Sequence, residues 1–325
     1  MFTYLTSNQL IIGLNDYHPL KRLIQEGRFK HIAFLHEQDE FGHALSETTK
    51  IIKLIESCNI PFDKIALDMR TNIITFNKNI DLIISYGSRY IHDIAKVSNT
   101  NACQLYTIET EPGHMSSCGA GLLWKGGKSV NRIIIPTVVF NSCHNVQKWN
   151  IMDKIYFLHD ITLALEACFL TTKSNDFIKT CAYNGIIECL RLWKKISKTQ
   201  SKSKLRKLYA QIAQADVLMK NAYNNAPLSP ESRLVAASTE HYRQFEIVLA
   251  YESNDAIETL IRKRGSSISQ ALEFYGSSLE EFKTKFSEFY LDFTEDPKRW
   301  EVAGDILGKH LSEVMGKNQQ TRRVV

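Results

Sequence analysis

Short, uninterrupted apolar runs alternate with amphipathic segments over the first 150 residues, and this alternation constrains the fold most strongly. The runs at residues 30–35 (KHIAFL), 81–85 (DLIIS) and 132–136 (RIIIP) predict buried strands. Apolar residues at helical spacing follow the first two runs, over residues 45–57 and 91–97. Continuous apolar strands separated by helices predict a parallel sheet that is covered on both faces.

The character of the chain changes near residue 151. Six segments then carry apolar residues at helical spacing and strand patterns disappear, over residues 155–171, 177–196, 204–223, 229–251, 255–263 and 267–290. We therefore predict two domains, an α/β domain over residues 1–150 and an all-α domain over residues 151–325. A chain of 325 residues is long enough for each domain to bury its own core.

Composition excludes several classes of protein. Hydrophobic residues make up 44% and charged residues 23%, a balance that excludes global disorder. A net charge of +5, spread along most of the chain, gives no reason to expect nucleic acid. The longest apolar stretches are far too short to cross a bilayer, and the N-terminus lacks the basic start of a secretory signal. Seven cysteines without a CxxC motif fit free thiols, so we predict a cytoplasmic protein.

One basic stretch interrupts the helical half. Residues 194–207 hold seven Lys or Arg and no acidic residue. Such a stretch could bind a phosphate-rich partner, but a solvated connection between two helices is the favoured interpretation.

Four short motifs, in order along the chain, resemble those of a known family. They are residues 81–96 (DLIISYGSRYIHDIAK), 135–137 (IPT), 159–167 (HDITLALEA) and 295–299 (EDPKR). The iron-containing alcohol dehydrogenases, which include glycerol dehydrogenases and have dehydroquinate synthases as relatives, show similar motifs in the same order. The resemblance implies a Rossmann-like α/β domain followed by an all-α domain. It also implies an NAD(P) cofactor and a divalent ion, zinc or iron, held by one Asp and three His.

The cofactor loop departs from the family pattern. A glycine-rich turn between strand and helix lets backbone N–H groups approach a pyrophosphate. Only Gly87 of the expected three glycines remains, and Ser88, Asp93 and Thr137 are the other cofactor candidates. Arg89 stands where close backbone approach is needed. It could neutralise a phosphate from the side, or it could fill the pocket and abolish binding.

Two acidic residues follow the strand over residues 30–35. A carboxylate at such a strand end can hold a ribose hydroxyl and disfavour a 2′-phosphate, so Glu37 or Asp39 would favour NAD over NADP. The alternative, which we favour, is that these acids merely open the next helix.

The metal ligands implied by the resemblance are mostly replaced. Their positions fall, in order, on or near His159, Leu163, Pro227 and His241. At most His159 and His241 remain, with Asp160 or Glu240 able to help. Because catalytic zinc sites generally use three protein ligands, we expect the site to be incomplete and without zinc or iron.

The segment before this motif is shortened. Positions 144 to 158 are all that separate Cys143 from His159, so a hairpin beside the family's active site is expected to be missing. The GGKS sequence at residues 126–129 precedes an apolar run instead of opening a helix, so we interpret it as a turn and not as a phosphate loop.

Three hypotheses follow for function. The first is a degenerate homologue that acts as a binding or partner subunit, as a homodimer or beside an active oxidoreductase in a biosynthetic pathway. The second is a working NAD(P)-dependent oxidoreductase on an alcohol or aldehyde, with a metal-free site in which His159 and His241 face the substrate. The third is a lyase that cyclises a sugar phosphate held by Lys96, Arg89 and Lys128. The sequence does not name a substrate, whether a small molecule or a peptide.

Overall fold

The computed structural model describes residues 9–14, 17–38, 41–67, 73–110, 113–118, 121–125, 128–132, 134–142 and 175–226, with the single positions 157, 160, 161, 163, 164 and 167. The chain divides into two compact units. The first unit comprises Met1–Lys125, Ser129–Gln147 and Gln200–Val217. The second unit comprises Gly126–Lys128, Lys148–Thr199 and Leu218–Val325.

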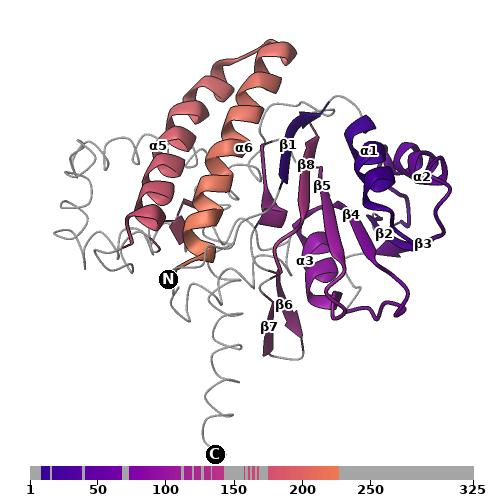
Figure 1. The fold of residues 1–325 in the computed structure, drawn as a ribbon. Coiled ribbons are helices and arrows are strands. Elements are labelled where there is room, and N and C mark those ends of the chain that lie inside the picture. Colours follow the sequence, from indigo (N-terminus) through magenta and orange to yellow (C-terminus); the bar gives the residue numbers. More distant parts are fainter. Residues whose placement is uncertain are drawn as a thin grey trace, which may run out of the picture. The chain divides into compact units, whose positions relative to one another are not determined.

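The first unit is built on a six-stranded sheet with the order β1-β8-β5-β4-β2-β3 (Figure 1). The strands are β1 (Gln9–Leu14), β2 (Ile32–Glu37), β3 (Phe62–Leu67), β4 (Leu82–Gly87), β5 (Gln104–Glu109) and β8 (Val138–Ser142). Each strand pairs with its neighbours in parallel. A separate two-stranded sheet consists of β6 (Gly121–Lys125) and β7 (Lys128–Arg132). The predicted parallel α/β architecture is confirmed.

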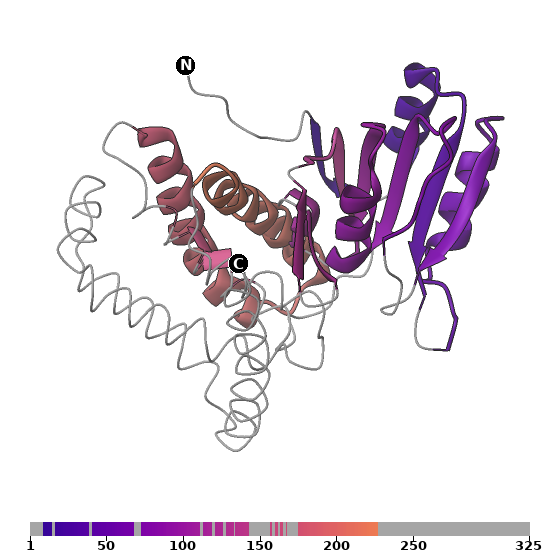
Figure 2. The same ribbon diagram turned by 90° about the horizontal axis from the view of Figure 1, so that it is seen from below.

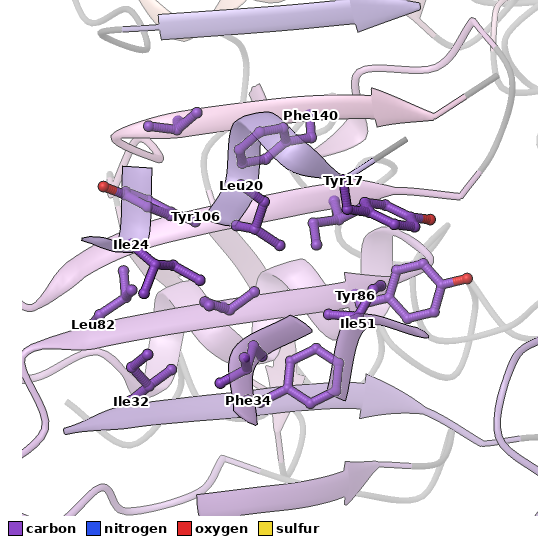
Figure 3. Close-up of a cluster of buried hydrophobic side chains, with 14 of the residues drawn as sticks. Tyr17, Leu20, Ile24, Ile32, Phe34, Ile51, Leu82, Tyr86, Tyr106 and Phe140 are labelled. Atoms are coloured by element: carbon purple, nitrogen blue, oxygen red, sulfur yellow. The ribbon is translucent and has the colours of Figure 1, made fainter. Parts of the chain in front are cut away.

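Helices cover both faces of this sheet, as the turned view in Figure 2 shows. They are α1 (His18–Gly27), α2 (Thr48–Glu56) and α3 (Arg89–Ser98), with a short 3-10 turn η1 (Ser116–Cys118) after β5. Leu20 of α1 and Ile51 of α2 pack on one face with Phe34 of β2 (Figure 3). Ile94 of α3 packs on the other face with Leu35 of the same strand. Because successive side chains of a strand point to opposite faces, β2 is buried on both sides.

The prediction of a strand over residues 132–136 is wrong. Strand β7 ends at Arg132, and β8 begins only at Val138. Pro136 has no N–H to donate to a sheet, which excludes it from the interior of a paired strand. The first backbone donor after it, the N–H of Thr137, bonds the carbonyl of Leu105 at 2.8 Å and brings the chain into line with β5.

The two helices described in the later part of the chain are α5 (Asp176–Lys198) and α6 (Lys202–Asn224). They confirm the predicted helices over residues 177–196 and 204–223. Positions 157, 160, 161, 163, 164 and 167 are each helical, as the segment over residues 155–171 predicts. The segments predicted from residue 229 onward and the expected missing hairpin lie outside the described residues.

The basic stretch falls at the end of α5 and the start of α6. Its exposed members are Lys195, Lys198, Lys202, Lys204, Arg206 and Lys207. This agrees with the favoured interpretation of a solvated connection between helices. The thiols of Cys58, Cys103 and Cys181 are free, as predicted.

Among the described residues, no helix is both long and apolar enough to span a bilayer.

Candidate functional site

The carboxyl ends of β2 and β4 mark the point where the chain changes direction across the sheet. From β2 the chain passes through α2 to β3, and from β4 it passes through α3 to β5 on the other side. The two helices lie on opposite faces, so the loops after β2 and β4 leave in opposite directions. In open parallel sheets, ligands bind in the crevice outside such a switch point. This edge is therefore the candidate functional site.

Register places four residues along this edge. Gly87 of β4 pairs with Glu109 of β5, and Glu109 pairs with Asn141 of β8. Glu37 is the last residue of β2, one position beyond the pair of His36 with Tyr86. Two of the four residues carry a carboxylate.

Glu37 points across the switch point to the start of α3. Its Oε2 accepts the backbone N–H of Ser88 at 2.6 Å, and the residue is 6% exposed. Ser88 is the N-cap of α3 in an extended conformation and makes no side-chain cap. A carboxylate at a helix N-terminus is stabilised by the helix dipole and by the unsatisfied N–H groups there. Glu37 therefore caps α3 from the neighbouring strand.

Gly87 makes room for this carboxylate. The φ angle of Gly87 is 154°, a value that side chains rarely allow. A Cβ placed on Gly87 would lie 2.9 Å from Cβ and Oε2 of Glu37 and from Cγ1 of Ile91. The remaining glycine of the loop thus admits a protein carboxylate at close range.

Arg89 and Asp93 lie one turn apart in α3. Arg89 Nε is 3.6 Å from Asp93 Oδ2, and Lys96 Nζ is 3.2 Å from Asp93 Oδ1. All three side chains are buried. Two of the three phosphate-holding residues of the lyase hypothesis, Arg89 and Lys96, therefore pair with a carboxylate of their own helix. The backbone of Lys128 belongs to β7, and its side chain is outside the part of the chain that the structure describes.

A polar network that the sequence did not predict lies beneath this edge. Ser85 Oγ is 2.8 Å from His92 Nδ1, and His92 Nε2 is 3.4 Å from Glu109 Oε2. Glu109 Oε1 in turn accepts the backbone N–H of Ser117 at 2.6 Å. A hydroxyl, an imidazole and a carboxylate in series can activate a nucleophile. Ser85 is completely buried, however, so no substrate reaches its hydroxyl, and the network is structural.

A further carboxylate of the first unit accepts a backbone N–H, as those of Glu37 and Glu109 do. Asp216 of α6 accepts the backbone N–H of Met115 at 2.7 Å with its Oδ2. His114 and Asp216 offer ligand atoms within 4.8 Å of each other, and the side-chain amide of Asn141 donates to the carbonyl of His114 at 2.8 Å. The loop after β5 is thus held by the ends of β8 and by α6.

Burial shifts the pKa of several groups near the edge. Burial lowers the pKa of His36, which stacks on Phe34 with a ring-centroid separation of 5.7 Å. Burial raises the pKa of Tyr86, and the nearby Tyr17 and Glu47 raise it further. Both shifts favour the neutral form of the side chain.

The remaining predicted site residues lie at the sheet edge or beyond the described ranges. Thr137 lies just before β8, where its backbone N–H donates to β5. Asp39, His159 and His241 lie outside the described residues. Their roles in ribose, substrate or metal binding stay predictions.

Asp160, next to the predicted ligand His159, lies in the second unit. There it contacts Lys220 and Tyr223 of α6. Its Oδ2 accepts from Lys220 Nζ at 2.7 Å, and its Oδ1 accepts from the hydroxyl of Tyr223 at 3.2 Å. A divalent ion on this carboxylate would lie beside the Lys220 ammonium, and the two cations would repel each other. Lys220 and Tyr223, its described partners in the second unit, therefore do not fit a divalent ion on Asp160.

The residues at the switch point do not fit a pyrophosphate either. The N–H of Ser88, which a phosphate oxygen would need, already donates to Glu37. The space that a glycine leaves open at Gly87 is filled by the same side chain.

Comparison with known proteins places the fold. No protein-family model matches the chain. No curated protein sequence matches it. Among solved structures, 1,3-propanediol oxidoreductase matches with a TM-score of 0.67 at 15% identity, over 90% of this chain and 87% of its own. An iron-containing alcohol dehydrogenase from Corynebacterium glutamicum matches with a TM-score of 0.59 at 14% identity, over 94% and 86%.

The chain has the fold of the iron-containing alcohol dehydrogenases. Sulfoacetaldehyde reductase from Bifidobacterium kashiwanohense, solved in complex with NAD+, is similar as well, with a TM-score of 0.64 at 10% identity over 90% of this chain and 86% of its own. The resemblance read from four short motifs is thereby confirmed for the iron-containing alcohol dehydrogenase fold, a Rossmann-like domain followed by helices. At these identities the likeness fixes the fold and leaves the chemistry to the residues of this chain.

Proposed function

We propose that this protein is a degenerate member of the oxidoreductase fold that no longer binds a dinucleotide at the β4–α3 turn. It acts instead as a binding or partner subunit in the cytoplasm, as a homodimer or beside an active oxidoreductase of a biosynthetic pathway. The observation that carries the proposal is the hydrogen bond of 2.6 Å from Ser88 N–H to the Glu37 carboxylate.

The bond puts an anion where the phosphate of a dinucleotide would bind. The N-terminus of a helix after a parallel strand attracts phosphate because of its free N–H groups and its dipole. Here Glu37 uses both, and it is buried at 6% exposure. A phosphate brought to the same N–H would meet a carboxylate of like charge.

The size of this repulsion decides whether binding survives. Two unit charges about 4 Å apart interact by about 4 kcal/mol at the effective dielectric constant of a protein surface. A dissociation constant of about 1 µM corresponds to about 8 kcal/mol of binding free energy. Subtracting the repulsion leaves about 4 kcal/mol, which corresponds to a dissociation constant of about 1 mM. We therefore expect NAD(P) binding to be lost at ordinary cofactor concentrations.

Titration with NADH, followed by nicotinamide fluorescence, tests the proposal. The wild-type chain should show no saturable binding below about 1 mM. Glu37→Gln removes the charge and keeps the shape and the hydrogen-bond acceptor, so this variant should bind NADH more tightly than the wild type. Micromolar binding by the wild type would contradict the proposal and favour a cofactor-dependent oxidoreductase.

That oxidoreductase is the alternative function, and one observation favours it. The similar sulfoacetaldehyde reductase was solved in complex with NAD+. On this alternative, Glu37 would have to swing away from Ser88 and release the helix N-terminus. His159 and His241 would then face an alcohol or aldehyde substrate in a metal-free site.

A further inference from the structure

We propose that Asp160 and Tyr223 form a cation site whose occupant is the ammonium group of the chain's own Lys220. Lys220 Nζ lies 2.7 Å from Asp160 Oδ2 and 3.1 Å from the hydroxyl oxygen of Tyr223. That hydroxyl donates to the second carboxylate oxygen, Asp160 Oδ1, at 3.2 Å. The three side chains close a ring of hydrogen bonds in which oxygens from two residues converge on one cation.

The ring is buried, and burial makes its charges depend on each other. The side chain of Lys220 is 1% exposed and that of Asp160 is 3% exposed. A buried charge is costly unless a partner of opposite charge and hydrogen bonds compensate it. The aromatic ring of Tyr223 adds a further attraction, because its centroid lies 5.6 Å from Nζ. Removal of the ammonium would therefore take away a positive charge that lies 2.7 Å from the buried Asp160 carboxylate.

The position of the ring in the sequence explains how it forms. Lys220 and Tyr223 are three residues apart in α6, so they lie on one face of the helix. Both residues and Asp160 belong to the second unit. The pair is separated from Asp160 by 60 and 63 positions along the chain.

The oxygens of Asp160 and Tyr223 can also attract a cation other than the Lys220 ammonium. Carboxylate and hydroxyl oxygens accept hydrogen bonds from an ammonium group, and carboxylate oxygens also bind divalent ions such as Mn²⁺ and Zn²⁺. Lys220 supplies the positive charge from within the chain, so the second unit does not need a metal at Asp160. If the ammonium is removed, the two acceptors should accept a cation from solution.

The first experiment compares the full-length wild type with Lys220→Ala after treatment with a chelator. The variant should unfold at a lower temperature than the wild type, and propylammonium chloride should partly restore that temperature. Tetramethylammonium chloride at the same ionic strength has no N–H to donate, so it should not restore it. Lys220→Ala should also bind Zn²⁺ at least tenfold more tightly than the wild type. Lys202→Ala, at the exposed start of the same helix, is the control and should match the wild type.

Two results would overturn the proposal. One is near-stoichiometric zinc or iron in the purified wild type that is lost in Asp160→Asn. The other is a Lys220→Ala chain that gains neither rescue by propylammonium nor affinity for Zn²⁺.

Should Lys220→Ala fail to fold, the double variant Asp160→Asn/Lys220→Met decides the matter. It removes both buried charges together, so it should unfold at a higher temperature than either Asp160→Asn or Lys220→Met alone. A double variant no more stable than the more stable of the two single variants would contradict a mutual charge pair.

Discussion

Gly87→Ala should destabilise the protein far more than an alanine at another glycine with positive φ. A Cβ at Gly87 would lie 2.9 Å from Glu37 and Ile91 atoms, closer than real Cβ contacts come. The backbone conformation at φ 154° adds strain of about 1–3 kcal/mol. Displacing Glu37 would also cost its bond to the N–H of Ser88, about 1.5–3 kcal/mol for a charged acceptor. The sum is about 2.5–6 kcal/mol.

Gly42 provides the matched control. It also has a positive φ, 80°, but a Cβ there would meet no atom within 4 Å. Gly42→Ala should therefore show backbone strain alone, about 1–2 kcal/mol.

Thermal unfolding followed by circular dichroism measures both variants. Gly87→Ala should lower the Tm by on the order of 5–10 °C and Gly42→Ala by only a few degrees. Equal Tm values for the two alanine variants would refute the close packing of Glu37 against the β4–α3 turn. They would also remove the support for a helix N-terminus closed by Glu37.

Three further predictions concern buried groups. Because burial lowers the pKa of His36, this side chain takes up a proton at a higher pH in the unfolded chain than in the folded chain. The free energy of unfolding should therefore fall as the pH drops below about 6.5, and urea titrations of His36→Gln should show a weaker fall. Asp93→Asn leaves Arg89 and Lys96 without the carboxylate between them and should cost about 3 kcal/mol in the same titrations; an unchanged midpoint would contradict this ion-pair account. Burial raises the pKa of the Cys181 thiol, so iodoacetamide should modify it at neutral pH much more slowly in the folded than in the urea-unfolded chain, as mass spectrometry would show.

The sequence predicted the sheet best where strands are buried on both faces. The run over residues 30–35 became β2, displaced by two residues, because a strand covered by helices on both sides is apolar throughout. The edge strands β1 and β3 were not predicted, and the inner strands β5 and β8 were missed as well. Residues of β3 alternate between half-buried and exposed positions, which gives a weaker pattern.

The site was predicted only in part, because the residues that contact each other in it lie far apart along the chain. The sequence marked Glu37 and Ser88 as separate candidates for a cofactor, but nothing in it shows that residues 51 positions apart would bond each other. Lys220 and Tyr223 stand out in the sequence only as members of a helical segment. Their meeting with Asp160 depends on packing within the second unit, which local patterns do not encode.

A crystal structure of the chain soaked in about 0.1 mM NAD+, tenfold below the dissociation constant expected here, would test the central claim most directly. We predict that the Glu37 carboxylate stays within hydrogen-bonding distance of the Ser88 N–H and that no pyrophosphate density lies at the start of α3. Pyrophosphate bonded to that N–H, with Glu37 turned away, would contradict the account. It would favour the alternative of a cofactor-binding oxidoreductase.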